Sequence, residues 1–149
     1  MRSVCATVVL VACGGAPRPA PEPPGCATAL RPGTLSADGG FELVTDGHSL
    51  EVSPGPQGGF HVFVGLEADG VERSGAIEWT LSTTSGRVLA RRSLDLDGLV
   101  LEETPCGWRR RRDLLVFERN DDVPGARDVP ASLVVSVQGQ STARSVIPR

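Results

Sequence analysis

Few side chains in this chain of 149 residues have types and spacing suited to metal binding. The histidines are His48 and His61, and one cysteine, Cys106, lies in the second half of the chain. A blue-copper site needs two histidines, one cysteine and a weak axial ligand, commonly methionine. The single methionine is Met1, and no closely spaced Cys, His and Met residues follow Cys106. We therefore expect no metal site and no other cofactor.

Catalytic patterns are equally scarce. The sequence has no GxSxG, HExxH or P-loop motif, so a Ser/His/Asp site would have to be assembled in space around one of two histidines. Glu102 and Glu103 are adjacent, and in a strand their carboxylates would point to opposite faces. We predict that the protein is not an enzyme. The alternative is a small metal-binding domain or a hydrolase that uses His61.

Four consecutive arginines, Arg109, Arg110, Arg111 and Arg112, follow Trp108 and form the strongest charge feature. In an extended strand, their guanidiniums would project from both faces and discourage edge-to-edge aggregation. In a loop they would converge on phosphate or carboxylate, which arginine binds in bidentate fashion. Trp108 would then stack on a sugar or on an arginine. Both readings stay open: a solvated run paired with nearby glutamates, or a contact with an anionic glycolipid or an acidic envelope protein.

The N-terminus predicts where these side chains act. Arg2 followed by the apolar residues 4–12 is typical of an export signal, which has a positive start and a short apolar run. The run is shorter than the roughly 20 residues that span a bilayer as a helix, so we do not expect a membrane-spanning segment here. Leu10-Val11-Ala12-Cys13 resembles the lipobox of bacterial lipoproteins. The resemblance implies that residues 1–12 are a signal peptide and that Cys13 is acylated, begins the mature protein and anchors it in a membrane. An ordinary secretory peptide is the alternative.

The resemblance also suggests a location. Gly14, rather than aspartate, follows the cysteine. In enteric lipoproteins this permits transfer to the outer membrane, so we expect a lipid-anchored protein of the cell envelope, at the outer membrane. Residues 13–25 contain five prolines and favour an extended polyproline II tether.

Residues 26–149 are predicted to form one domain, long enough to bury a core. Without residues 1–12 the side chains carry 14 Arg against 18 Asp and Glu, a net charge of −4, which argues against nucleic acid as a partner. With Cys5 removed and Cys13 acylated, two cysteines remain, and an exported domain most simply pairs them. We predict a Cys26–Cys106 disulfide. A reactive or metal-binding thiol is the alternative, although the chain has no CxxC motif.

After residue 40, short segments rich in Val and Leu alternate with Gly, Pro, Asp and Ser. Period-two alternation predicts strands at 49–53, 60–66, 77–81 and 133–137, and further strands are expected at 87–96, 99–103, 113–118 and 142–147. Seven to nine short strands at this spacing predict an immunoglobulin-like or fibronectin-like antiparallel β-sandwich, with a barrel as the alternative.

The stretch GPQGGFHV, residues 55–62, is the most individual in the chain. Its glycines and proline allow a turn with positive φ before the strand. The stretch resembles one in uncharacterised lipoproteins of myxobacteria and related delta-proteobacteria, a resemblance that implies no activity. His61 should lie opposite Phe60 and Val62, either facing solvent and neighbouring groups or contacting a ligand.

These patterns together predict a lipid-anchored β-sandwich that acts as a non-catalytic binding or structural module. It contacts the membrane through its N-terminal lipid. The candidate contact residues are His61, Trp108, Arg109, Arg110, Arg111 and Arg112.

Overall fold

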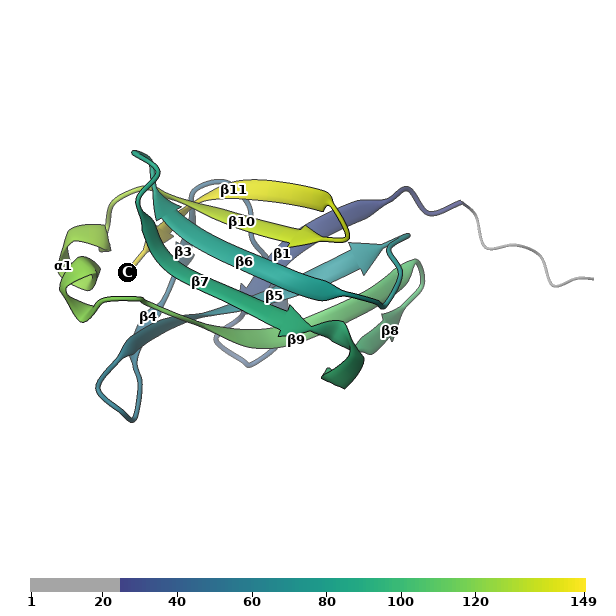
Figure 1. Ribbon diagram of the computed structural model, residues 1–149, viewed down its shortest axis with the longest axis horizontal. Helices are drawn as coiled ribbons and strands as arrows, with labels where there is room; N and C mark the ends of the chain where they lie inside the picture. Colours follow the sequence, from purple (N-terminus) through teal and green to yellow (C-terminus); the bar gives the residue numbers. More distant parts are fainter. Residues whose placement is uncertain (1–24) are drawn as a thin grey trace, which may run out of the picture.

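The computed structural model describes residues 25–149, which fold into two packed β-sheets (Figure 1). The predicted all-β sandwich is therefore confirmed. The strands are β1 (Ala29–Leu35), β2 (Phe41–Leu43), β3 (His48–Leu50), β4 (Val52–Pro54), β5 (Phe60–Asp69), β6 (Ala76–Thr83), β7 (Val88–Asp95), β8 (Glu102–Thr104), β9 (Gly107–Val116), β10 (Ala131–Val137) and β11 (Gln140–Pro148). Three short helical turns are η1 (Leu96–Gly98), η2 (Asn120–Asp122) and α1 (Val123–Ala126).

The first sheet has the order β2-β1-β5-β9-β8, with β4 paired to β5, and the second has the order β3-β11-β10-β6-β7. The seven long strands divide into three in the first sheet and four in the second, an immunoglobulin-like and fibronectin-like arrangement. Four three-residue strands raise the number to eleven, above the seven to nine expected. All pairings are antiparallel except that of β3 with β11.

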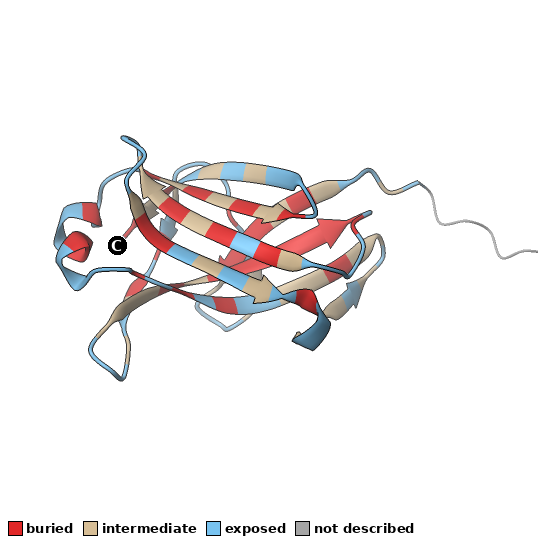
Figure 2. Ribbon diagram, viewed as in Figure 1, coloured by how far each residue is buried: buried red, intermediate tan, exposed pale blue. Residues whose placement is uncertain are grey.

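Alternating apolar side chains build the core between the sheets, as Figure 2 shows by the alternation of buried and other residues along β6 and β10. The inward residues of the three clearest strands are at most 1% exposed: Val62, Val64, Leu66, Ile77, Trp79, Leu81, Leu133, Val135 and Val137. Period-two alternation thus predicted which faces are buried.

The segment 49–53, expected to be one strand, is instead split between the two sheets. β3 pairs with β11 and β4 pairs with β5. The last residue of the chain bridges the break, because the Arg149 amide donates to the Leu50 carbonyl and the Arg149 carbonyl accepts from Val52. Leu50 and Val52 are both buried, so the alternation correctly predicted which side chains face the core. It did not predict that the strand pairing changes between these two residues.

The chain enters the domain at the end opposite α1 (Figure 1). The predicted signal peptide, Cys13 and nearly all of the predicted tether lie outside the described residues. Within residues 25–149, no helix has the length and apolar character needed to span a membrane.

Candidate binding site

The arginine run lies in a strand, β9, and a β-bulge interrupts it. Val64 pairs with Asp113 and Leu66 with Arg110, so β9 has one extra residue between these pairs. Gly65 on β5 lies opposite the bulge, where a Cβ would sit 2.5 Å from the Arg111 carbonyl oxygen. A glycine is required at this position because another backbone approaches it closely.

The bulge decides where the arginines point. Before it, Trp108 faces the core; after it, Asp113 and Leu115 do, so the alternation shifts by one residue. The four guanidiniums therefore do not converge on one ligand, as the loop interpretation required. From Arg110 onward, β9 pairs only with β5 among the described residues, which leaves its other edge open.

Two of the four arginines are occupied by carboxylates on the outer face of the first sheet. The Arg109 Nε donates to Glu67 at 2.8 Å, and its Cζ lies 4.7 Å from the centre of the Phe41 ring. The Arg111 guanidinium forms an ion pair of 2.7 Å with Glu102. The expected pairing with a nearby glutamate is found for Arg111 with Glu102, whereas Arg109 pairs with Glu67, which is 42 positions away in the sequence.

The other two arginines line a pocket of about 190 Å³ with Arg92, Asp113 and Leu114. Arg92 comes from β7, which lies beside β9 along one side of the sandwich (Figure 1). Its Nη1 donates to the Leu114 carbonyl at 2.9 Å, and it forms no ion pair with a described carboxylate. Arg112 likewise forms none; its guanidinium lies 5.3 Å from the centre of the Phe63 ring. Two guanidiniums in this pocket are therefore free of a counter-charge within residues 25–149.

Asp113 is the one carboxylate in this pocket. Its side chain is 2% exposed, Oδ1 accepts from Arg110 Nε at 2.8 Å, and Oδ2 has no hydrogen-bond partner among the described residues. Burial raises the pKa of Asp113, and the hydrogen bond from Arg110 and the charges of Arg110 and Arg92 offset only part of that effect. The pocket consequently presents a net positive charge, with three arginines against one buried carboxylate.

Trp108 is a core residue, which corrects its assignment as a contact residue. It is 1% exposed, and its indole Nε1 donates to the Val71 carbonyl at 2.8 Å. Stacking on a sugar or a surface arginine is therefore ruled out by its position. The turn before it occupies Pro105 and Cys106, and β9 begins at Gly107, so Trp108 lies in a strand and not in the loop that the contact interpretation required.

His61 lies on the outer face of β5, where its ring packs edge-on against Phe63 with the centroids 5.0 Å apart. It lies outside the pocket formed by Arg92, Arg110 and Arg112. His48 is on β3, in the other sheet. Across residues 25–149, no three His, Cys, Asp or Glu side chains come together in an arrangement that could hold a metal ion.

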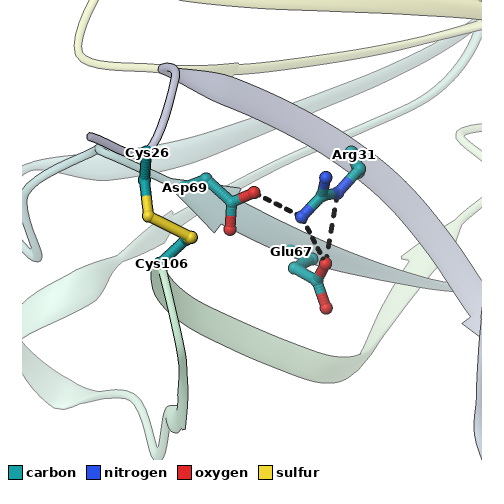
Figure 3. Close-up of a disulfide and its surroundings, with 5 residues drawn as sticks. All are labelled: Cys26, Arg31, Glu67, Asp69 and Cys106. Carbon is teal, nitrogen blue, oxygen red and sulfur yellow. Dashed lines mark hydrogen bonds and ion pairs between the residues drawn. A yellow bond between two sulfur atoms is a disulfide. The ribbon is translucent and has the colours of Figure 1, made fainter. Parts of the chain in front are cut away.

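The Cys26–Cys106 disulfide predicted from the cysteine count is present (Figure 3). The Cα atoms are 5.5 Å apart, and the bond joins residues separated by 80 positions. It fastens the segment before β1 to the two-residue turn between β8 and β9. The start of the domain is thereby held to its body.

Sequence reasoning missed a network of charged side chains beside the disulfide (Figure 3). Glu67 accepts from Arg31 Nη2 at 2.7 Å and from Arg109, and Arg31 also pairs with Asp69. Burial by itself would raise the pKa of Glu67, but the hydrogen bonds and charges of Arg109 and Arg31 outweigh it and hold the pKa below its usual value. Glu67 and Asp69 are two positions apart, a spacing that places both side chains on one face of a strand. Their partner Arg31 is 36 positions away from Glu67, so no local pattern in the sequence indicates it.

Comparisons with protein-family models, with curated proteins and with solved structures gave no significant match to this chain.

Proposed function

We propose that the protein is a lipid-anchored module of a bacterial cell envelope, at the outer membrane, that binds an anionic partner without catalysing a reaction. The binding surface is the edge pocket of Arg92, Arg110 and Arg112. The partner is a phosphate-bearing glycolipid or lipid surface. The lipobox resemblance of residues 10–13 supports the anchor.

One observation carries the binding proposal: arginines from two different sheets meet at an open edge, and two of them lack a counter-charge. Arg92 and Arg112 form no ion pair with a described carboxylate, whereas Arg109 and Arg111 do. Guanidiniums bind phosphate oxygens in pairs and lose little hydration when they do so. Such a site can attract an anion although the net charge of the chain is negative. Salt screens the repulsion from carboxylates that lie farther away than the Debye length, which is about 8 Å at physiological ionic strength.

The test compares two double variants in a mature chain that carries Cys13→Ser, so that no acyl group holds it to vesicles. Arg92→Gln with Arg112→Gln removes the two edge charges that have no carboxylate partner and leaves the ion pair of Arg110 with the buried Asp113 in place. The control, Arg119→Gln with Arg144→Gln, removes the same amount of charge elsewhere: Arg119 precedes η2, and Arg144 lies on β11. Each arginine near an anionic surface contributes about 1 kcal/mol.

The edge variant should therefore bind anionic vesicles roughly 30-fold more weakly, and the control variant should bind almost as the parent does. Equal binding by the two variants would contradict the proposal. If the edge variant instead aggregates without any change in binding, the arginines protect the open edge of β9 and do not bind a ligand.

A further inference from the structure

Exposed apolar side chains are concentrated along the same edge as the arginines. Within residues 25–149, five large apolar side chains are exposed, and three of them accompany β9. Leu114 and Val116 belong to that strand, and Val100 contacts it through Arg110. Single exposed apolar residues are common on protein surfaces, but a group of them beside a charged patch is typical of an interaction site.

The strand register joins Leu114 and Val116 to the arginine pocket. Leu114 itself lines that pocket. It lies opposite Phe63 of β5, and Val116 lies opposite His61, whose ring packs against Phe63. Leu114 and Val116 are two positions apart, so both side chains are on the outer face of the first sheet. Cross-strand neighbours on one face are about 5 Å apart, and Phe63, Leu114 and Val116 therefore form a continuous surface with His61.

Val100 extends this surface toward the end of the sandwich where the chain enters. It is 82% exposed, and its carbonyl accepts from Arg110 Nη1 at 3.2 Å. It precedes β8 by two residues, and the turn after β8 holds Cys106, which is bonded to Cys26 at the start of the domain. η1 and β8, which flank Val100, accordingly lie toward that end in Figure 1. Val100 is therefore at the end of the domain that the proposed tether joins to the membrane.

The charges along this edge attract an anion only modestly. The arginine pocket shares Arg92 with a neighbouring hollow, and the two together are lined by four arginines and three carboxylates: Arg91, Arg92, Arg110 and Arg112 against Glu78, Asp113 and Glu118. The exposed Asp97 of η1, three residues before Val100, adds a further negative charge nearby. A soluble phosphate would therefore be held weakly. Apolar contact beside the arginines adds a contribution that a lipid surface offers and a soluble phosphate does not.

We infer that this side of the sandwich lies on an anionic lipid surface, with Val100, Leu114 and Val116 inserted between the headgroups while the arginines contact lipid phosphates. Binding of this kind depends on the buried apolar area together with the attraction to anionic lipid. The inference rests on the proposed function and specifies the lipid surface as the source of the phosphate.

The length of chain before the domain is compatible with this arrangement. Cys13, the proposed site of the lipid anchor, precedes residue 25 by 12 positions, which span at most about 40 Å when fully extended. An anchor at this distance keeps the edge close to the membrane and raises its effective concentration there.

The test measures binding of the mature chain with Cys13→Ser to vesicles of phosphatidylglycerol and phosphatidylcholine. Val100→Thr with Val116→Thr keeps the shape of both exposed side chains and replaces one methyl group of each by a hydroxyl. This variant should bind roughly 15-fold more weakly, about fourfold for each methyl group that is no longer buried.

The matched control is Leu43→Thr with Val129→Thr, which changes two exposed apolar side chains away from the edge. Val129 is 46% exposed and Val116 is 48% exposed, and Leu43 lies on β2 at the far side of the first sheet. The control variant should bind almost as the parent chain does, and a thermal melt verifies that both variants are folded.

Insertion itself is measured with bromine on the lipid acyl chains, which quenches the fluorescence of nearby tryptophan. Trp79 and Trp108 are fully buried, so they should not respond. The fluorescence of Val100→Trp should be quenched on the brominated vesicles, and that of Val129→Trp should not.

Two results would overturn the inference and leave the proposed anionic site in place. One is equal binding by the two double variants, and the other is an unquenched Val100→Trp variant that still binds the vesicles. Either would mean that the arginines bind phosphate without apolar contact. A parent chain that does not bind these vesicles even at low salt would overturn the proposed function together with this inference, so the two failures are distinguishable.

Discussion

Replacing Cys26 and Cys106 by serine should lower the free energy of unfolding by up to about 4.5 kcal/mol. The bond closes a loop between residues 80 positions apart. The loop-entropy relation gives a loss of about 15 cal/mol/K for such a loop, which is about 4.5 kcal/mol at 25 °C. For a domain of this size the melting temperature falls by roughly 4 °C per kcal/mol, or up to about 18 °C.

Urea denaturation followed by tryptophan fluorescence measures this change, because Trp79 and Trp108 are both fully buried. The slope of the unfolding free energy against urea should also rise, since an unfolded chain without the crosslink exposes more surface. Reductant should reproduce the loss in the parent chain and have no effect on the double variant. A loss below about 1 kcal/mol would refute the reasoning, because the bond would then not restrict the unfolded chain to the extent that the loop-entropy relation requires.

Three further predictions concern other parts of the chain. Cys13→Ser should abolish incorporation of labelled palmitate in the producing bacterium, and label that persists in the variant would contradict acylation at this residue. Gly65→Ala should lower stability by about 1–3 kcal/mol in urea denaturation, because its Cβ would meet the Arg111 carbonyl at 2.5 Å; an unchanged midpoint would show that the bulge adjusts. Asp113→Asn should gain stability relative to the parent as pH rises above 3.8, because the raised pKa of Asp113 makes its ionised form unfavourable only in the folded state. A stability difference that does not vary with pH would contradict this.

The sandwich was predictable because its core strands carry a local signal. Along β6, Ile77, Trp79 and Leu81 alternate with polar residues, and each is buried as the period-two pattern requires. β1 was not predicted, because Arg31-Pro32-Gly33 has no alternation and contains two residues that usually interrupt strands. Its Gly33 is instead covered by the ring of Phe41 from β2, a tertiary contact that no local pattern indicates.

The candidate sites were predictable only in part, for the same reason. The disulfide followed from counting the cysteines that an exported domain would retain. The run of four arginines was evident, but its division into paired and unpaired residues depends on the bulge opposite Gly65. Arg92 was missed because it joins Arg110 and Arg112 through the approach of β7 to β9. Trp108 was misjudged because proximity to charged residues in sequence does not reveal which face of a strand is buried.

The most direct measurement of the central proposal is binding of the mature chain with Cys13→Ser to vesicles with and without anionic lipid, at low and at high salt. The edge of Arg92, Arg110 and Arg112 predicts binding to the anionic vesicles at low salt, none to neutral vesicles, and progressive release as salt screens the charges. A chain that ignores anionic vesicles at low salt, or binds both kinds equally, would contradict an anion-binding function for this protein.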